Sequence, residues 1–349
     1  MTTTGQASAA PVAAGQNLSS RHGLYLGSIA AGALASVAFV LAFFMLLDHD
    51  SRLPPPPIVN NLCADEKLLF LRQHTFDSPT VLVLGSSIAW RSVDSASVSK
   101  ATGGLRTFNG SFCALHMNQT EFVGGWLLDR LPSVRAVIVV ASPFDFVGCN
   151  VSPTELFNRQ AADDFVFERK WKWTFYFRYF EPVSMMRNAL HVGALRSNSN
   201  PFQSLVFTKF GDGPIDTDRP FPELTYGKVP EFDRTCFAAL TTFAKRLASE
   251  NRTLAVVTTP LNPEWKKRFD PDDKVGGQLG RAIVEALQQT NAQYWDGDAN
   301  IPMGPEAFAD AIHLRWSAAK TFSGTFAHAL AGYLVPSRAS QADLTQLAR

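Results

Sequence analysis

The sequence predicts an α/β fold with a central parallel sheet, joined to one N-terminal transmembrane helix. Short apolar runs alternate with amphipathic stretches over residues 61–337, polar residues follow several of those runs, and an uncharged run spans residues 24–47. Strands that alternate with helices favour a parallel sheet covered by helices on both faces. With 46% hydrophobic residues in a chain of 349, the protein can bury a sizeable core.

The N-terminal region predicts a membrane anchor. Residues 1–23 begin with small, uncharged side chains and are expected to form a disordered cytoplasmic tail. The run 24–47 would measure about 36 Å as a helix, enough to cross a bilayer. A cleaved signal peptide and a buried core helix are the alternatives, but Asp48 and Asp50 follow the run instead of a small-x-small cleavage site.

The charges beside this run predict its orientation. Arg21 precedes it and acidic residues follow it, which favours a cytoplasmic N-terminus and places the remaining chain outside a bacterial inner membrane. Residues 48–60 are expected to form a Pro-rich linker, in which Pro54–Pro57 act as a stiff spacer. One catalytic domain is expected over 61–337, and a polar tail over 338–349.

Apolar runs and helical periodicity predict the elements of the domain. Each expected strand is short and apolar, and the first ends at a Gly-Ser-Ser turn. Each expected helix carries apolar residues at helical spacing. The expected strands are 80–84, 134–140, 253–258 and 293–295, and the expected helices are 119–131, 234–249, 275–290 and 317–334.

Polar residues follow the expected strands at the edge where parallel sheets bind ligands. Ser87 stands on the turn after the first strand, while Asp310 and His313 share one loop before the last helix. A serine hydroxyl needs a histidine to take its proton and an acid to orient that histidine. We therefore expect Ser87 as nucleophile, His313 as base and Asp310 as its orienter, although a simple turn and a helix cap would explain each segment alone.

These segments resemble the SGNH (GDSL-like) hydrolase superfamily. Gly85-Ser86-Ser87 stands for its nucleophile block, Phe108-Asn109-Gly110-Ser111 for its glycine block, and Asp310-Ala-Ile-His313 for its last block. The resemblance implies a three-layer, flavodoxin-like fold that needs no metal or cofactor. It also implies an oxyanion hole built from the backbone N–H groups of Ser87 and Gly110. An α/β-hydrolase elbow fits less well, since Ser87 follows the first strand after the linker.

The chain departs from the family at its third block, where an Asn normally donates to the oxyanion. Here Ala141-Ser142-Pro143 contains no Asn, so either Ser142 donates in its place or the oxyanion hole has only two donors. Losing one such donor costs on the order of a hundredfold in rate. The departure leaves open a non-catalytic subunit that binds polysaccharide or assists assembly.

The Pro143-Phe144-Asp145 ending and the single anchor resemble a narrower, extracytoplasmic branch of this family. Its members act with membrane-bound O-acyltransferases, as in the D-alanyl-transfer protein of teichoic acid modification and in exopolysaccharide O-acetylation proteins. The resemblance implies an acyltransferase, most simply an acetyltransferase, with a polysaccharide acceptor and such a membrane partner. An acetyl esterase is the alternative. The net charge of +1 gives no general attraction to nucleic acid.

An aromatic-rich insertion is expected over residues 151–230. Trp171 and Trp173 belong to a run of aromatic residues on one parity, which favours a platform that stacks on sugar rings. A belt that docks on the membrane or a partner is the other functional interpretation, and a strand or helix that buries its aromatic residues in the domain is an alternative of equal weight.

The four cysteines all follow the anchor, as expected in an oxidising compartment. Cys113 and Cys149 lie in the loops after the glycine block and after Ser142, which we expect side by side at the site. The preferred pairing is therefore Cys113–Cys149, and four free thiols are the alternative.

Overall fold

The computed structural model describes residues 16–197, 203–217 and 226–335. The chain divides into two compact units, Met1–Leu53 and Pro54–Arg349. The predicted disorder of residues 1–15 and the predicted polar tail at 338–349 lie outside the described residues.

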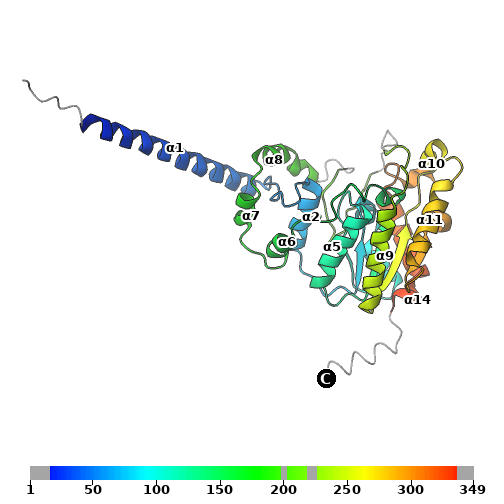
Figure 1. Ribbon diagram of the computed structural model, residues 1–349. Coiled ribbons are helices and arrows are strands. Elements are labelled where there is room, and N and C mark those ends of the chain that lie inside the picture. Colours follow the sequence, from blue (N-terminus) through cyan, green and yellow to red (C-terminus); the bar gives the residue numbers. More distant parts are fainter. Residues whose placement is uncertain (1–15, 198–202, 218–225, 336–349) are drawn as a thin grey trace, which may run out of the picture. The chain divides into compact units, whose positions relative to one another are not determined.

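The first unit contains one long helix, α1, Gln16–His49 (Figure 1). It begins eight residues before the expected start at Leu24, so the expected tail is wrong for residues 16–23. The segment His22–His49 has a mean hydropathy of 2.5 over its most apolar window and is long and apolar enough to cross a membrane.

The second unit is built on a parallel sheet with the strand order β2-β1-β3-β4-β5. The strands are β1 Val81–Leu84, β2 Thr107–Asn109, β3 Ala136–Ala141, β4 Thr253–Thr258 and β5 Gln293–Asp296. The order 2-1-3-4-5 is the flavodoxin-like arrangement, so the predicted fold class is confirmed. Four of these strands were expected from the sequence, whereas β2, with three residues, was missed.

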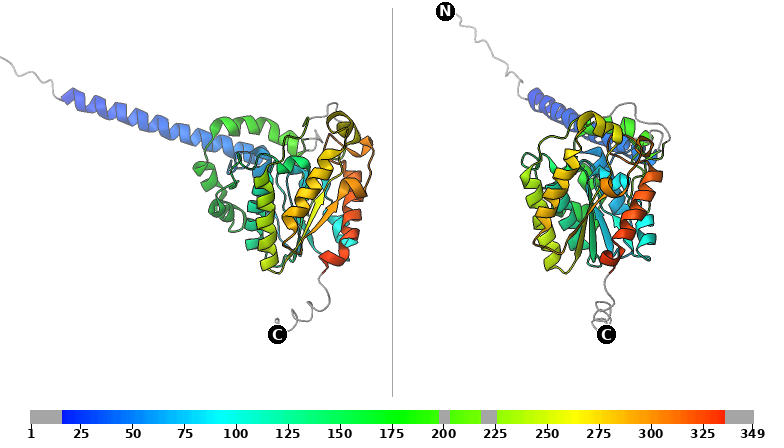
Figure 2. Two further views of the ribbon diagram at one scale, coloured as in Figure 1. Left: turned by 45° about the vertical axis from the view of Figure 1, so that its right-hand side comes forward. Right: turned by 90° about the vertical axis from the view of Figure 1, so that its right-hand side faces the viewer.

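Helices cover both faces of this sheet, as Figure 2 shows from two sides. Successive strand residues point to opposite faces: Leu82 and Leu84 join the core under α5, α9 and α11, whereas Val81 and Val83 join the core under α4 and α13. The bounds of these helices are α4 Ser95–Ala101, α5 Met117–Arg130, α9 Arg234–Ser249, α11 Lys274–Leu287 and α13 Trp316–Ala329. The result is the expected three-layer architecture.

The insertion after β3 adds three helices, which Figure 1 places at one side of the second unit, beside α2. These four are α2 Leu62–Gln73, α6 Arg159–Val166, α7 Lys172–Arg178 and α8 Pro182–Arg196. The remaining short helices are α3 Ser87–Ser92, α10 Pro263–Phe269, α12 Gly297–Asn300, α14 Ala331–Leu334 and the 3₁₀ turns Pro143–Phe146 and Pro305–Ala307. Residues 198–202 and 218–225 of the expected insertion lie outside the described residues.

The expected proline spacer is wrong, because the second unit begins at Pro54 and buries Pro54–Pro57. The Tyr176 hydroxyl of α7 donates a hydrogen bond of 2.6 Å to the Pro54 carbonyl oxygen. Proline has no backbone N–H, so this segment can be buried with fewer donors left unpaired.

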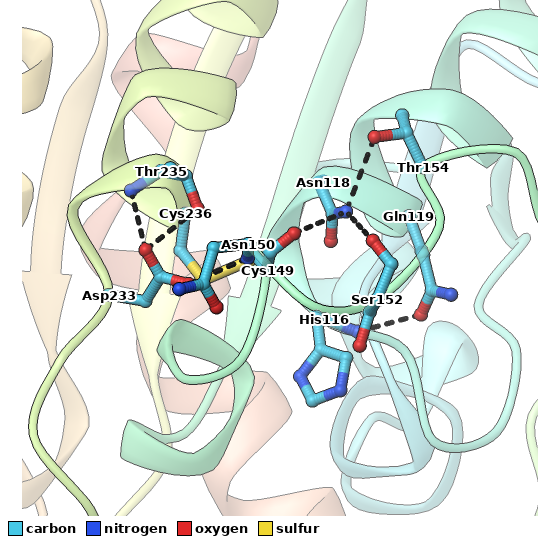
Figure 3. The surroundings of a disulfide bond; sticks show 10 residues. All are labelled: His116, Asn118, Gln119, Cys149, Asn150, Ser152, Thr154, Asp233, Thr235 and Cys236. Carbon is cyan, nitrogen blue, oxygen red and sulfur yellow. Dashed lines mark hydrogen bonds between the residues drawn. A yellow bond between two sulfur atoms is a disulfide. The ribbon is translucent and has the colours of Figure 1, made fainter.

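The expected Cys113–Cys149 pairing is also wrong. The disulfides are Cys63–Cys113 and Cys149–Cys236, so none of the four cysteines is free. The two loops do lie side by side, since the Asn118 Nδ2 donates to the Cys149 carbonyl oxygen at 3.3 Å, but each cysteine pairs with a helix beside its own loop. Cys113 instead meets α2, and Cys149 meets α9 (Figure 3).

Candidate active site

Ser87 stands at the carboxyl end of β1, at the first position of α3. The turn requires Gly85, whose φ is +146° and whose added Cβ would lie 2.2 Å from the Val140 carbonyl oxygen. Ser86 caps the helix, since its Oγ accepts from the Ile88 N–H at 3.2 Å. The Ser86 side chain is therefore used to cap the helix, while Ser87 lines the cavity of the site.

Asp310 and His313 lie in a tight loop before α13. The Asp310 Oδ1 accepts hydrogen bonds from the N–H groups of Ile312 and His313, each at 2.8 Å. The Ala309 N–H donates to the His313 carbonyl oxygen at 2.8 Å, which closes the loop on itself. The three-residue spacing therefore presents the acid and the imidazole together.

Ser87, His313 and Asp310 form one hydrogen-bonded chain. The His313 Nδ1 lies 2.7 Å from the Asp310 Oδ2, and the His313 Nε2 lies 3.0 Å from the Ser87 Oγ. Burial raises the pKa of Asp310, but attraction to His313 and the loop's hydrogen bonds outweigh it and hold that pKa below its usual value. An ionised carboxylate only accepts, so Nδ1 carries the proton and Nε2 is free to accept from Ser87.

A cavity of about 350 Å³ opens onto this chain of residues. Its lining includes Leu62, Cys63, Ser87, Trp90, Arg91, Cys113, Leu195, Leu205, Tyr226, Asp310 and His313. The expected sugar platform, Trp171 and Trp173, does not line it. A larger groove of about 1380 Å³ between α9 and α11 contains none of the triad, so the triad and not the cavity size identifies the site.

Two of the expected oxyanion donors have other partners. The Gly110 N–H donates to the Val83 carbonyl oxygen at 2.8 Å, and Gly110 does not line the cavity. The Ser142 N–H and Oγ both donate to the Asp145 Oδ2, at 2.6 and 3.1 Å. The expected roles of Gly110 and Ser142 are therefore wrong as the structure stands. The Ser87 N–H opens α3 and has no acceptor within that helix.

Arg91 is a site residue that the sequence analysis missed. It is 7% exposed, its Nη2 donates to the Ser204 carbonyl oxygen at 2.9 Å, and its guanidinium stacks 4.2 Å from the Trp90 ring centroid. Its Nη1 is buried without a hydrogen-bond partner among the described residues. Burial lowers the pKa of Arg91 to about 10 against the attraction of Asp310 and Tyr226, so the side chain stays charged at neutral pH.

The position of Arg91 follows from its spacing. It lies four residues after Ser87 on α3, and helical side chains point back toward the helix N-terminus, which brings the guanidinium over the turn that carries the serine. The spacing of four residues between Ser87 and Arg91 was therefore the feature of the sequence from which Arg91 could have been predicted as a site residue.

Tyr226 forms another part of the lining that the sequence analysis missed. Its ring centroid lies 6.0 Å from that of His313, in an edge-on arrangement. Burial and the nearby Asp310 carboxylate raise the pKa of Tyr226 to about 12, so its hydroxyl remains a donor at neutral pH.

A buried polar network holds the segment that supports Arg91. Asp212 accepts from the Ser95 Oγ at 2.7 Å and from the Asn109 Nδ2 at 3.0 Å. The Lys67 Nζ donates to the carbonyl oxygens of Asn109 and Gly211, each at 2.8 Å, and burial lowers the pKa of this lysine to about 7 despite the attraction of Asp212. These bonds tie the segment 203–217 to the sheet.

Within the ranges that the structure covers, no cluster of three or more His, Cys, Asp or Glu side chains is arranged to hold a metal ion.

Comparisons with known proteins identify no family for this chain. No protein-family model and no curated protein matches it. Among solved structures, it is similar to a protein assigned as an arylesterase from Agrobacterium tumefaciens, with 10% identity and a TM-score of 0.38 over 72% of this chain and 98% of the other. It is also similar to a carbohydrate acetylesterase family member from Sinorhizobium meliloti, with 11% identity and a TM-score of 0.32 over 73% of this chain and 98% of the other.

Proposed function

We propose that this protein is a membrane-anchored serine acyltransferase that moves a small acyl group, of the acetyl class, onto hydroxyls of a cell-envelope or exported polysaccharide. The observation that carries the proposal is the chain of hydrogen bonds from the Asp310 carboxylate through His313 to the Ser87 hydroxyl. Such a chain activates a serine as an acyl-group acceptor near neutral pH.

The proposed reaction has two halves. The Ser87 Oγ attacks the acyl carbonyl carbon of an ester or thioester donor, and the His313 Nε2 takes the hydroxyl proton. The bond to the donor's leaving group breaks, and that group receives the proton from His313. In the second half, His313 takes the proton of a sugar hydroxyl, whose oxygen attacks the acyl carbon. The bond between that carbon and the Ser87 Oγ breaks, and His313 gives the proton to the Ser87 Oγ.

Resemblance, anchorage, disulfides and cavity size support an extracytoplasmic transferase. The sequence resembles extracytoplasmic SGNH proteins that work with membrane-bound O-acyltransferases, and α1 is apolar enough to anchor the chain. The two disulfides suit an oxidising compartment outside the cytoplasm. A cavity of about 350 Å³ is at the small end of ligand sites, which suits a short acyl group.

Arg91 is expected to stabilise negative charge that develops at this site. Its unpartnered Nη1 offers a donor to an oxygen of the bound acyl group, so Arg91→Gln should lower the acylation rate of Ser87 by about a hundredfold. Arg91→Lys should retain part of the rate through its charge. The measurement is stopped-flow acylation by a neutral ester, p-nitrophenyl acetate. An unchanged rate in folded Arg91→Gln would show that the guanidinium serves only packing.

The test of the proposed nucleophile is the intact mass of the full chain in detergent after exposure to p-nitrophenyl acetate. One acetyl adduct is expected on the wild-type protein and on Ser86→Ala, and none on Ser87→Ala. Ser86→Ala is the matched control, because it removes the neighbouring hydroxyl and a cap worth about 1 kcal/mol. The absence of an adduct on folded wild-type protein would refute an autonomous serine enzyme and favour a binding subunit.

Transfer and hydrolysis are separated by the fate of the acyl-serine. For a transferase, p-nitrophenol release should show a burst and then a slow phase, and a polysaccharide acceptor should accelerate the slow phase. An esterase should turn over steadily in water without an acceptor.

A further inference from the structure

Residues 171–190, which contain α7 and the first part of α8, carry an exposed apolar surface, here called the apolar stripe. Its members are large apolar side chains that are 47–75% exposed: Trp171, Phe177, Phe180, Val183, Met186 and Leu190. Within α8, the exposed members follow one another at spacings of three and four residues, which places them on one face of the helix. Single exposed apolar residues are normal on soluble proteins, but six within twenty residues indicate an interaction surface.

The other face of α8 is already packed. Met185, Ala189 and Val192 are buried. A helix that is apolar on opposite faces is expected to be covered on both of them. Because that face is already buried, the exposed face is the one that still requires a covering surface.

The charge of this segment indicates what covers it. Residues 169–196 contain six basic residues and one acidic residue, Glu181, and of the six Lys170 and Arg196 are ion-paired with Asp164 and Glu66 outside this range. Arg178 and Arg187 are exposed on the two helices that carry the stripe. Apolar side chains beside basic ones are the composition of helices that lie in the headgroup region of anionic membranes.

The covalent chain limits the distance between this segment and the end of α1. The Tyr176 hydroxyl of α7 is bonded to the Pro54 carbonyl oxygen, and Pro54 follows the last residue of α1, His49, by only five residues. Backbone reach alone limits the distance between the Cα atoms of His49 and Pro54 to about 18 Å. Burial of the prolines in the second unit removes the spacer that would have lifted the domain away.

We propose that the apolar stripe lies on the surface of the membrane that holds α1, at the level of anionic lipid headgroups. The inference rests on the membrane anchorage in the proposed function and is independent of the Ser87 chemistry. Leu195, which lines the serine cavity, is five residues beyond Leu190 on α8, or about 7.5 Å along its axis. Docking of the stripe would thus hold the serine cavity close to the bilayer, where a membrane-embedded acyl donor or partner is within reach.

The test is spin labelling of the full chain in lipid nanodiscs. All four native cysteines are in disulfides, so a single introduced cysteine takes the label. Leu190→Cys reports on the stripe and Phe39→Cys, 74% exposed on α1, reports on the anchor. Val284→Cys is the matched control, an exposed apolar residue on α11. Collision rates with oxygen, which partitions into lipid, and with a water-soluble nickel chelate are measured for each label.

In discs of phosphatidylcholine and phosphatidylglycerol, the oxygen-to-nickel ratio at position 190 should exceed that at position 284 several-fold. Arg178→Glu with Arg187→Glu should return position 190 toward the value of position 284. An aqueous ratio at 190 with a lipid ratio at 39 would overturn the docking proposal while keeping the anchor. An aqueous ratio at 39 would overturn the anchorage itself. A label at 190 that is shielded from both reagents and shows dipolar broadening would assign the stripe to a second copy of the chain and also overturn the proposal.

Discussion

Asp310→Asn is expected to slow the acylation of Ser87 by about 10⁴-fold, the loss typical of an acid replaced by its amide in a serine triad. The oxygen of the introduced amide can still accept the two N–H bonds that shape the loop, so the fold should persist. The amide nitrogen, however, presents N–H to the imidazole where the carboxylate presented an acceptor. This exchange favours the His313 tautomer whose Nε2 carries a proton and no longer accepts from Ser87.

The measurement is the burst rate with p-nitrophenyl acetate, together with the melting temperature. Glu306→Gln is the matched control, because it makes the same chemical change at an exposed acid four residues earlier. The control should retain the wild-type rate. A small effect of Asp310→Asn would mean that His313 is oriented without the carboxylate, and the proposed triad would reduce to a serine and a histidine.

Much of the fold was predictable from local pattern. The strands β1, β3 and β4 are buried on both faces, so each is a continuous apolar run that the sequence displays directly. The helices α5, α9, α11 and α13 each pack one apolar stripe onto the sheet, which produces their helical periodicity. By contrast, β2 has only three residues, and no periodicity can be recognised over so short a length.

The insertion shows the limit of periodicity as a guide. Its aromatic residues alternate in the sequence, yet the run spans the end of α6, a turn and α7 instead of one strand. Phe165 and Phe175 are consequently buried, while Trp171 and Phe177 are exposed. Residues of one parity share a face only in an extended chain, and nothing local excluded that conformation.

The candidate site also has a part that was predictable from the sequence and a part that was not. The grouping of Ser87, Asp310 and His313 was predictable, because the loops that follow parallel strands all lie at the carboxyl edge of the sheet. The oxyanion donors and the disulfides depend instead on register and on which segments pack together. The Gly110 N–H bonds to Val83 of β1, and the two cysteines that were expected to pair bond instead to Cys63 of α2 and Cys236 of α9. Neither fact is contained in the spacing of residues along the chain.

Removing either disulfide is expected to destabilise the protein by a similar amount, but only one removal should impair the site. Chain entropy gives about 4.6 kcal/mol for Cys149–Cys236, which closes a sequence separation of 87 residues, and about 4.1 kcal/mol for Cys63–Cys113, which closes 50. Cys63 and Cys113 line the serine cavity, whereas the other bridge joins the two ends of the insertion.

Hydrogen bonds around Cys149–Cys236 support this difference (Figure 3). The Asn150 N–H donates to the Asp233 Oδ2 at 2.7 Å, and the Asn118 Nδ2 donates to the Cys149 carbonyl oxygen at 3.3 Å. These bonds continue to hold the base of the insertion in the native state after the sulfur atoms are removed. The bridge therefore acts mainly on the unfolded chain, through loop closure.

The measurement compares the double variants Cys149→Ala/Cys236→Ala and Cys63→Ala/Cys113→Ala. Both should lose several kcal/mol in denaturant unfolding, each relative to the wild-type chain with its disulfides intact. Below the unfolding transition, the first variant should keep the wild-type burst rate and the second should lose much of it, since α2 is no longer tied to the loop after β2. Equal losses of activity would contradict a local role for Cys63–Cys113. They would mean that the Cys149–Cys236 bridge, which joins the ends of the insertion, is also needed to shape the serine cavity.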